Sequence, residues 1–423
     1  MNLRLPGQYE DAESGLFYNK ARYYDPARGE YLTPDPLGNP DGPNPYSYVR
    51  YNPLKYVDPE GLILFAFDGT GNDPSSQTNV QHFARAYDFE SSYDREKSID
   101  GLRYYRRGPG TSSDDWLDNS AIGGAIAPRL RGIVDEQLSN IRSYVVDRTR
   151  WEIDKASRFG QSYSPKNPLD INVDVVGFSR GAAAGREFMN RVNELTNQGY
   201  YRSQANGACV RVILRFAGLF DTVLGTNTDF NMRTAIPASV KYVAHAVAVN
   251  EYRTLFPLES IEESFQNPGF SSNRIERGFI GAHSDIGGGY TPVDGGDLSD
   301  VALNWMVRQA SSNGVTMKPL EAAQRTVSNP IVHDPRRDAK WRALGDPLAI
   351  KDRAVRYPNA SDAPFLNRDS QQAPIQGMTA AEAQRLNLIR FRSLGIRDLT
   401  DTRVGDVDMA AYSRWLNQNY GMQ

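Results

Sequence analysis

The pattern of apolar positions separates the chain into two kinds of sequence. Before residue 62, short aromatic stretches are broken by prolines and glycines, which is typical of small β-hairpins. After it, apolar strands alternate with helical stretches, and the predicted strands are residues 63–67, 102–105, 171–176, 211–219 and 277–280. This alternation favours a mostly parallel sheet with helices on both faces. We therefore expect an α/β fold that follows a short β-hairpin segment.

Helical periodicity is clearest in three places. Apolar residues spaced three and four apart mark one buried face of a helix over 130–145. Residues 298–309 and 380–395 are predicted to form two further helices. The polar stretch 329–376 between these two helices predicts either a cap over a functional site or a segment packed on its rim.

Composition and charge exclude several classes of protein. The 423 residues include 48 basic and 51 acidic side chains without a long run of one sign, so nucleic acid is not an expected ligand. Cys209 is the single cysteine and the four histidines lack zinc spacing, which excludes a disulfide scaffold and a structural zinc module. We expect no metal and no cofactor. The apolar run 210–220 is too short to cross a bilayer and no cleavable apolar segment follows Met1, so we expect a soluble protein without its own signal peptide.

The sequence GFSRG at residues 177–181 follows the predicted strand 171–176 and precedes a run of small residues that predicts a helix. This is the context of a nucleophile elbow, a tight turn that needs glycine on both sides of the serine and presents its hydroxyl at a helix N-terminus. The alternative is that Ser179 only caps the helix. The strand before it and the helix after it favour a catalytic serine.

A catalytic serine needs a histidine base, and in this kind of fold the chain order is serine, acid, histidine. His82 precedes Ser179 and fails that order. His245 has the apolar neighbours of a packed residue, and His333 lies in a polar loop beyond the last clear strand. His283 follows the strand 277–280 and opens a glycine-rich loop, which favours it as the base.

Two aspartates compete for the role of the orienting acid. Asp221 comes at the end of the strand 211–219, where the carboxyl end of a parallel strand places functional residues. Asp285 lies two residues after His283, and so close an acid is more typical of a residue that braces its own loop. The strand-end position favours Asp221.

An oxyanion hole needs two preorganised N–H donors, one from the residue after the nucleophile and one from a loop after an early strand. Arg180 is the first predicted donor, and Gly69 or Thr70, after the strand 63–67, is the second. An apolar strand that ends in Asp-Gly-Thr also resembles the start of haloacid-dehalogenase phosphatases. Their nucleophile would fall on Ala66, which cannot form an aspartyl-phosphate, so that alternative fails.

Residues 1–62 hold nine of the 23 tyrosines and nine of the 25 prolines, in stretches such as GLFYNKARYYDPARGEYLTPDPLG and NPYSYVRYNPLKYVDPEGL. They closely resemble the conserved end of the core in Rhs and YD-repeat proteins, where a β-shell encloses a variable C-terminal toxin and DPxGL marks the boundary. The resemblance implies self-cleavage after Leu62 by Asp35 and Asp58, two carboxylates that share a proton as in aspartic proteases. By sequence alone, capping of Asp-Pro turns is the simpler interpretation of both aspartates.

From residue 63 to about 310 the chain carries FAFDGTGND, YYRRGPGT, GFSRGAAAG, FAGLFDTV and GAHSDIGGGY. These motifs resemble the type VI secretion lipase effectors whose elbow reads GFSRGA. The resemblance implies an α/β-hydrolase with Ser179, Asp221 and His283 as its triad, and phospholipase A activity on bacterial membrane lipids. Pro109 stands where that family more often has valine or another small apolar residue. We expect an Rhs segment at 1–62, a catalytic domain at 63–315, and a helical or cap region at 316–423 that fits the family only loosely.

Three functions compete at this point. In the first, residues 63–423 are a lipolytic toxin, and the resemblance implies export through a type VI spike or adaptor protein, action in the target periplasm, and a cognate immunity protein. The second is a soluble carboxylesterase with a vestigial Rhs segment; the third, a noncatalytic scaffold, is disfavoured by the intact order of serine, aspartate and histidine. Five apolar residues have two interpretations: a mobile flap at a lipid entrance or, more simply, ordinary core packing. These residues are Trp116, Leu117, Ile122, Ile126 and Leu130.

Overall fold

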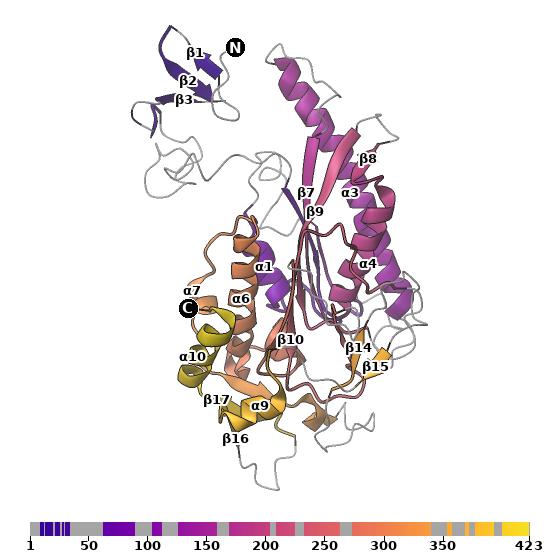
Figure 1. Ribbon diagram of the computed structural model, residues 1–423, viewed down its shortest axis with the longest axis vertical. Coiled ribbons are helices and arrows are strands. Elements are labelled where there is room, and N and C mark those ends of the chain that lie inside the picture. Colours follow the sequence, from indigo (N-terminus) through magenta and orange to yellow (C-terminus); the bar gives the residue numbers. More distant parts are fainter. Residues whose placement is uncertain are drawn as a thin grey trace. The chain divides into compact units, whose positions relative to one another are not determined.

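The computed structural model describes residues 9–11, 13–19, 22–25, 28, 30–33, 62–88, 104–111, 126–158, 169–203, 209–224, 232–262, 273–339, 353–357, 369–371, 377–392 and 400–422 (Figure 1). The chain forms two compact units, Met1–Glu60 and Gly61–Gln423. The predicted self-cleavage residues Asp35 and Asp58 lie outside the described residues. Their pairing therefore stays a prediction.

The first unit contains a four-stranded antiparallel sheet in the order β1-β2-β3-β4. Its strands are β1 (Tyr9–Asp11), β2 (Leu16–Asn19), β3 (Arg22–Asp25) and β4 (Glu30–Tyr31). Tyrosines face each other across it, since Tyr18 pairs with Tyr23 and Tyr24 with Tyr31. The short aromatic stretches therefore form the β-hairpins that the sequence predicts.

The second unit is built on a seven-stranded sheet whose main path runs β12-β10-β9-β7-β5-β6. All neighbours on this path are parallel, and β8 adds an antiparallel pair to β9. The strands are β5 (Leu62–Phe67), β6 (Tyr105–Arg106), β7 (Leu169–Phe178), β8 (Tyr200–Arg202), β9 (Cys209–Phe220), β10 (Tyr242–Ala248) and β12 (Arg274–Phe279). The mostly parallel α/β sheet is confirmed, although β8 and β10 were not among the predicted strands.

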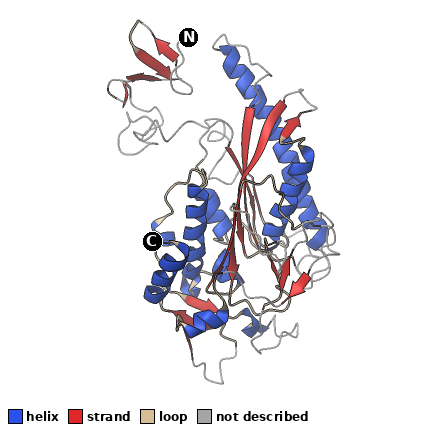
Figure 2. Cartoon of the chain, in the orientation of Figure 1, coloured by secondary structure: helices blue, strands red, loops and turns tan. Residues whose placement is uncertain are grey.

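Helices cover both faces of this sheet (Figures 1 and 2). On one face pack α3 (Ile126–Arg158) and α4 (Ser179–Leu195), and on the other α1 (Asn79–Ala86), α6 (Ser299–Ser312) and α10 (Met409–Tyr420). Strand β5 serves both cores because side chains alternate along a strand. Phe65 joins the core under α3 and α4, whereas Leu64 joins the core under α1 and α6. Leu130 is fully buried in the first of these cores, which supports the packing interpretation rather than the flap for this residue.

The C-terminal part adds two small three-stranded sheets. One has the order β13-β17-β16 and consists of Ile331–His333, Arg403–Val407 and Ile389–Phe391. The other has the order β11-β14-β15 and consists of Leu258–Glu259, Val355–Tyr357 and Asp369–Gln371. The remaining short helices in the described ranges are α5 (His283–Gly287), α7 (Ala322–Arg325) and α9 (Ala380–Arg385), with 3-10 turns at Pro292–Asp294, Gly296–Leu298 and Pro335–Arg337.

The predicted helix over 380–395 is wrong in its second half. Helix α9 ends at Arg385, and Asn387 adopts a left-handed backbone with φ of 55°, which a helix cannot continue through. Ile389 then begins β16 and pairs with Val407. The region after residue 316 is therefore mixed in structure rather than helical.

Candidate active site

Ser179 lies in a strained turn between β7 and α4. Its φ is 57°, in the left-handed region, which is energetically unfavourable for any residue that carries a side chain. The turn excludes side chains on both flanks: a Cβ at Gly177 would lie 2.7 Å from the Cα of Ala182, and one at Gly181 would lie 2.3 Å from the carbonyl oxygen of Phe67. Backbone packing thus holds the serine in the geometry of a nucleophile elbow.

Asp221 and His283 meet at the same edge of the sheet as the serine. Ser179 follows β7, Asp221 follows β9 and His283 follows β12, and the carboxyl ends of these parallel strands share one edge. The Nδ1 of His283 lies 2.5 Å from the Oδ2 of Asp221. The N–H of Val223, two residues after Asp221, donates to the carbonyl oxygen of Ser179 at 3.4 Å, which ties the acid loop to the elbow.

Two aromatic rings enclose the imidazole of His283. Phe178, the residue before the serine, lies 4.5 Å from it between ring centroids, and Phe256 lies 5.0 Å away edge-on. Burial lowers the pKa of His283, and the Asp221 carboxylate partly offsets this effect. The ring is therefore held neutral at the elbow, in the protonation state that a general base needs.

Arg353 contacts this site although no sequence pattern predicts it. Its Nη1 donates to Oδ1 of Asp221 at 2.6 Å and its Nη2 donates to Oδ2 at 2.9 Å. Although burial alone would raise the pKa of Asp221, Arg353 and His283 hold it well below its usual range. Arg353 comes from the polar stretch 329–376, where no periodicity or motif marks it.

Two of the other histidines, His245 and His333, pair with other carboxylates. His245, in β10, faces Oε2 of Glu276 through Nδ1 at 2.8 Å and accepts the N–H of Thr222 on Nε2 at 3.0 Å. His333 faces Oδ1 of Asp285 through Nδ1 at 2.6 Å. His245 is therefore packed as the sequence indicates, and Asp285 contacts a histidine other than His283.

The loop after β5 is organised around the buried carboxylate of Asp68. It accepts hydrogen bonds from the hydroxyls of Tyr105 at 2.6 Å and Thr78 at 2.8 Å, and from Gln81 at 2.9 Å. Burial raises the pKa of Asp68, and these donors oppose the increase. The N–H of Gly69 also donates to Asp68, at 2.8 Å.

Gly69 is therefore the weaker of the two predicted loop donors to an oxyanion, because its N–H is already engaged. Among the described residues, the N–H of Thr70 donates to no group, and the Thr70 hydroxyl accepts from Nη1 of Arg180 at 3.3 Å. Arg180 is the second residue of α4, at the helix N-terminus. A Cβ at Gly108 would lie 1.7 Å from the carbonyl oxygen of Gly69, so glycine in the GPGT motif fits the close approach of the two loops.

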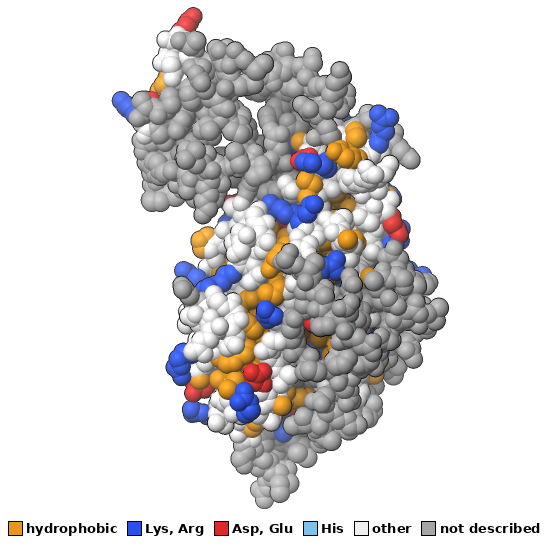
Figure 3. Space-filling view, viewed as in Figure 1, with side chains coloured by type: hydrophobic (Ala, Val, Ile, Leu, Met, Phe, Trp, Pro, Cys, Tyr) orange, Lys and Arg blue, Asp and Glu red, His pale blue; other side chains and the backbone are white. Residues whose placement is uncertain are grey.

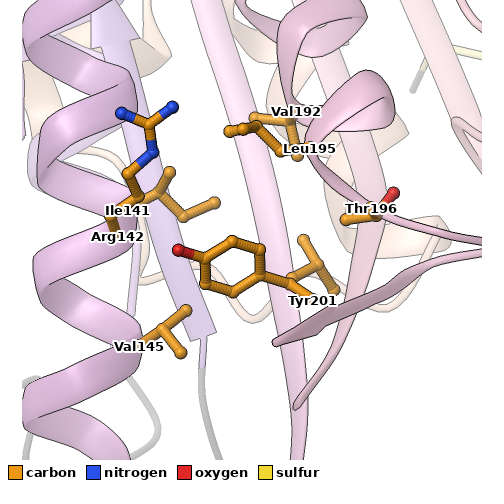
Figure 4. A pocket seen from close by; sticks show the side chains of 8 residues that line it. Ile141, Arg142, Val145, Val192, Leu195, Thr196 and Tyr201 are labelled. Carbon is orange, nitrogen blue, oxygen red and sulfur yellow. The ribbon is translucent and has the colours of Figure 1, made fainter. Parts of the chain in front are cut away.

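A small apolar pocket lies at the far end of α4 from the serine (Figure 4). The Tyr201 ring points into it between side chains of α3, such as Ile141 and Val145, and Leu195 at the end of α4. Helix α4 has 17 residues, and the 16 steps from Ser179 to Leu195 correspond to about 24 Å along the helix axis. This pocket is therefore separate from the site around Ser179.

Figure 3 shows described acidic and basic side chains spread over one face of the molecule rather than gathered in one patch of a single sign. Within the described ranges, no three His, Cys, Asp or Glu side chains are grouped as ligands for a metal ion. Among the described helices, none is both long and apolar enough to span a membrane.

Residues 185–309 match the family model of the T6SS phospholipase effector Tle1-like catalytic domain. The matched range includes Asp221 and His283 and begins six residues after Ser179. Two solved structures are also similar. One is an uncharacterized protein from Pseudomonas aeruginosa, with a TM-score of 0.48 and 22% identity, covering 63% of this chain and 49% of that chain. The other is the Tle1 effector bound to the VgrG spike, with a TM-score of 0.37 and 19% identity, covering 64% of this chain and 76% of that chain.

The N-terminal residues are similar to curated Rhs-type toxins. Toxin protein Tse5 of Pseudomonas aeruginosa is 53% identical over 62 residues, which are 15% of this chain and 5% of Tse5. The probable deoxyribonuclease RhsA of Dickeya dadantii is 32% identical over 187 residues, which are 41% of this chain and 12% of RhsA. The chain thus spans a small part of the length of these relatives. It joins an N-terminal segment similar to Rhs-type toxins to a region that matches the Tle1-like phospholipase effector catalytic domain, as its motifs predict.

Proposed function

We propose that residues 63–423 hydrolyse carboxylic-ester bonds of bacterial membrane phospholipids, as a phospholipase A, with Ser179, His283 and Asp221 as the triad. The observation that carries this proposal is the buried His283–Asp221 pair, 2.5 Å apart, beside a serine with a left-handed backbone. The match of residues 185–309 to a phospholipase effector domain supports the choice of lipid as substrate.

The chemistry follows from the roles of these side chains. The Oγ of Ser179 attacks the ester carbonyl while Nε2 of His283 takes its proton, and Asp221 stabilises the resulting imidazolium. The backbone N–H groups of Arg180 and Thr70 are the proposed donors to the tetrahedral oxyanion. His283 then returns the proton to the lysophospholipid alcohol as it leaves, and water hydrolyses the acyl-enzyme to release a fatty acid.

One comparison of substrates separates this proposal from a soluble carboxylesterase. Purified protein is assayed on phospholipid vesicles and on a soluble short-chain ester at equal enzyme concentration. A phospholipase releases fatty acid and lysophospholipid from the vesicles at a rate that matches or exceeds ester hydrolysis. Ester hydrolysis without vesicle hydrolysis would favour the soluble carboxylesterase and contradict the lipid assignment.

We further propose delivery by type VI secretion through a spike or adaptor protein, action in the target periplasm, and neutralisation by a cognate immunity protein. The Tle1 effector, in its complex with the VgrG spike, is an example of such a partnership in a similar domain. Residues 63–423 with a periplasmic export signal should be toxic to a Gram-negative host and raise free fatty acid there. Cytoplasmic expression should be better tolerated. Equal toxicity of Ser179→Ala would contradict the proposal.

Self-cleavage after Leu62 by Asp35 and Asp58 is a separate proposal, which rests on the similarity of the N-terminal residues to Rhs-type toxins. In a protein with a complete shell upstream, mass spectrometry should find a new N-terminus at Ile63, and Asp58→Asn should prevent its formation. A different new N-terminus, or an intact product, would exclude this mechanism.

A further inference from the structure

Arg353 reaches the catalytic acid from a distant part of the chain. It forms a forked pair with both oxygens of Asp221, and the two side chains are 3% and 0% exposed. The planar guanidinium matches a carboxylate in this two-point geometry, which fixes orientation as well as charge. Asp221 also has a left-handed backbone with φ of 40°, a strained conformation that the surrounding structure must hold in place.

Strand pairing fixes the place of Arg353. The next residue, Ala354, accepts the N–H of Leu258 at 2.8 Å, and Arg356 accepts the N–H of Ser260 at 2.9 Å, which aligns β14 with β11. Strand β11 is in turn joined to the loop after β9, because the N–H of Glu259 donates to the carbonyl oxygen of Thr222. The ladder that carries Arg353 is thus attached next to the catalytic acid.

Arg353 also holds the backbone of Phe256, one of the two aromatic residues that enclose the imidazole of His283. Its Nε donates to the carbonyl oxygen of Phe256 at 2.8 Å, and the Phe256 ring lies edge-on against His283. Its Nη1 additionally contacts the carbonyl oxygen of Ala248 at 3.3 Å, while the N–H of Ala248 donates to Asp221 at 2.9 Å. One side chain therefore links the acid to the aromatic residue that confines the base.

We propose that Arg353 is a positioning residue for the triad, so that the region after residue 316 completes the active site rather than only covering it. This inference rests on the proposed function of the serine, histidine and aspartate. Arg353 acts through Asp221 and Phe256 and touches no reacting atom. Its loss should lower the rate of nucleophile activation without weakening substrate binding.

The charge of Arg353 gives this role a pH signature. The charged groups that face His283 are Asp221 and Glu251, which favour the imidazolium, and Arg253, which disfavours it, with Arg353 neutralising the Asp221 carboxylate. Removing the guanidinium exposes His283 to the full charge of Asp221. The pKa of His283 then rises, and the acidic limb of the activity profile moves to higher pH.

The test uses the full chain with Arg353→Gln and Arg353→Lys. Two rates are measured: labelling of Ser179 by a fluorophosphonate probe, and turnover on phospholipid vesicles across pH. For Arg353→Gln we expect labelling and kcat to fall about 10- to 100-fold with KM changed less than about threefold, and the acidic limb to move upward. Arg353→Lys should recover part of the rate, because it keeps the charge but not the fork.

Arg215→Gln is the matched control. Arg215 forms a similar forked ion pair with Asp174 inside the sheet, with side chains 13% and 0% exposed, and its loss also leaves a buried carboxylate without its cation. This variant should lose thermal stability but keep the wild-type labelling rate and pH profile. Equal slowing by both variants, or an Arg353→Gln protein that labels like wild type with an unshifted profile, would overturn the inference.

Assays of the wild-type protein distinguish failure of the proposed lipid substrate from failure of the proposed role of Arg353. Labelling of Ser179 without hydrolysis of vesicles would refute the lipid substrate alone, and the labelling rates of the variants would still decide the role of Arg353. Failure of the wild-type protein to label would overturn the triad and the inference together.

Discussion

Two buried histidine–carboxylate pairs, His283–Asp221 and His245–Glu276, have similar geometry. They differ in the hydrogen bonding of the histidine Nε2. Both imidazoles are buried, and each Nδ1 faces a carboxylate, at 2.5 Å in the first pair and 2.8 Å in the second. Burial lowers the pKa of both rings. The Nε2 of His245 accepts the N–H of Thr222, whereas the Nε2 of His283 has no hydrogen-bond partner among the described residues.

A third pair makes the same distinction. His333 faces Asp285 through Nδ1, and its Nε2 lies 2.9 Å from the carbonyl oxygen of Asp294. A carboxylate partner therefore does not identify a base in this protein. The second nitrogen distinguishes the proposed base, His283, because a base must keep this nitrogen available for the proton of the nucleophile.

Ser179→Ala should have the largest effect on activity. Alanine can occupy the elbow but has no nucleophile, so ester hydrolysis should fall roughly 10⁴- to 10⁶-fold while the fold is kept. Steady-state kinetics and circular dichroism check the two halves of this expectation. Residual turnover within about tenfold of wild type would show that another nucleophile acts.

His283→Ala and His245→Ala test the comparison directly. Loss of His283 should lower activity nearly as much as loss of Ser179, because His283 is the proposed acceptor of the serine proton. Loss of His245 removes one hydrogen bond from the buried Glu276 carboxylate, which keeps Ser260 and Ile261 as donors. This should cost about 1–3 kcal/mol of stability with a much smaller change in kcat. Kinetics and urea unfolding of both variants measure the contrast. Full activity in His283→Ala, with loss in His245→Ala, would reverse the assignment.

Asp221→Asn and Asp285→Asn test the two acids. The amide at position 221 misorients the histidine and removes its charge partner, so kcat should fall about 10⁴-fold. Asp285→Asn disturbs the contact with His333 and should reduce stability more than turnover. Rates normalised to the folded fraction, measured for both variants, distinguish the effects. A larger loss of turnover in Asp285→Asn would identify it as the acid.

The smallest expected effect is a shift in the pH dependence of wild-type activity. Burial lowers the pKa of His283 from 6.5, so the neutral base persists to lower pH than in a solvent-exposed histidine. The acidic midpoint of kcat/KM should therefore lie below pH 6.5. A midpoint at or above that value would contradict a buried base. Measurements of kcat/KM between pH 4 and 9 suffice.

The parts of the site that were predicted from sequence are those that a local pattern specifies. Ser179 is marked by flanking glycines between a strand and a helix, and Asp221 by its place at the end of an apolar strand. Arg353 has no such mark, because its proposed role depends on the pairing of β14 with β11, almost a hundred residues earlier in the chain. Asn387 likewise interrupts a helical pattern through its backbone conformation, which composition does not reveal.

The engagement of Gly69 also escaped prediction. Its N–H is occupied by the neighbouring Asp68, a local contact that depends on how Tyr105 and Gln81 gather around that carboxylate. Gly69 was predicted as one of two alternative loop donors to the oxyanion. The structure places it instead under the ring of Phe178, where a Cβ would lie 2.7 Å from the ring.

The position of Leu62 sets an order of events for any release of the C-terminal part. Leu62 is the first residue of β5 and pairs with Asn172, and the next residue, Ile63, is fully buried opposite Val173. A protease needs its target bond extended and unpaired, and the bond between these two residues enters the central ladder. Pairing of Leu62 and Ile63 with β7 would therefore hinder cleavage of the bond between them. We therefore expect any cut at this bond to precede the pairing of β5 with β7, so that the central sheet is completed only after the cut.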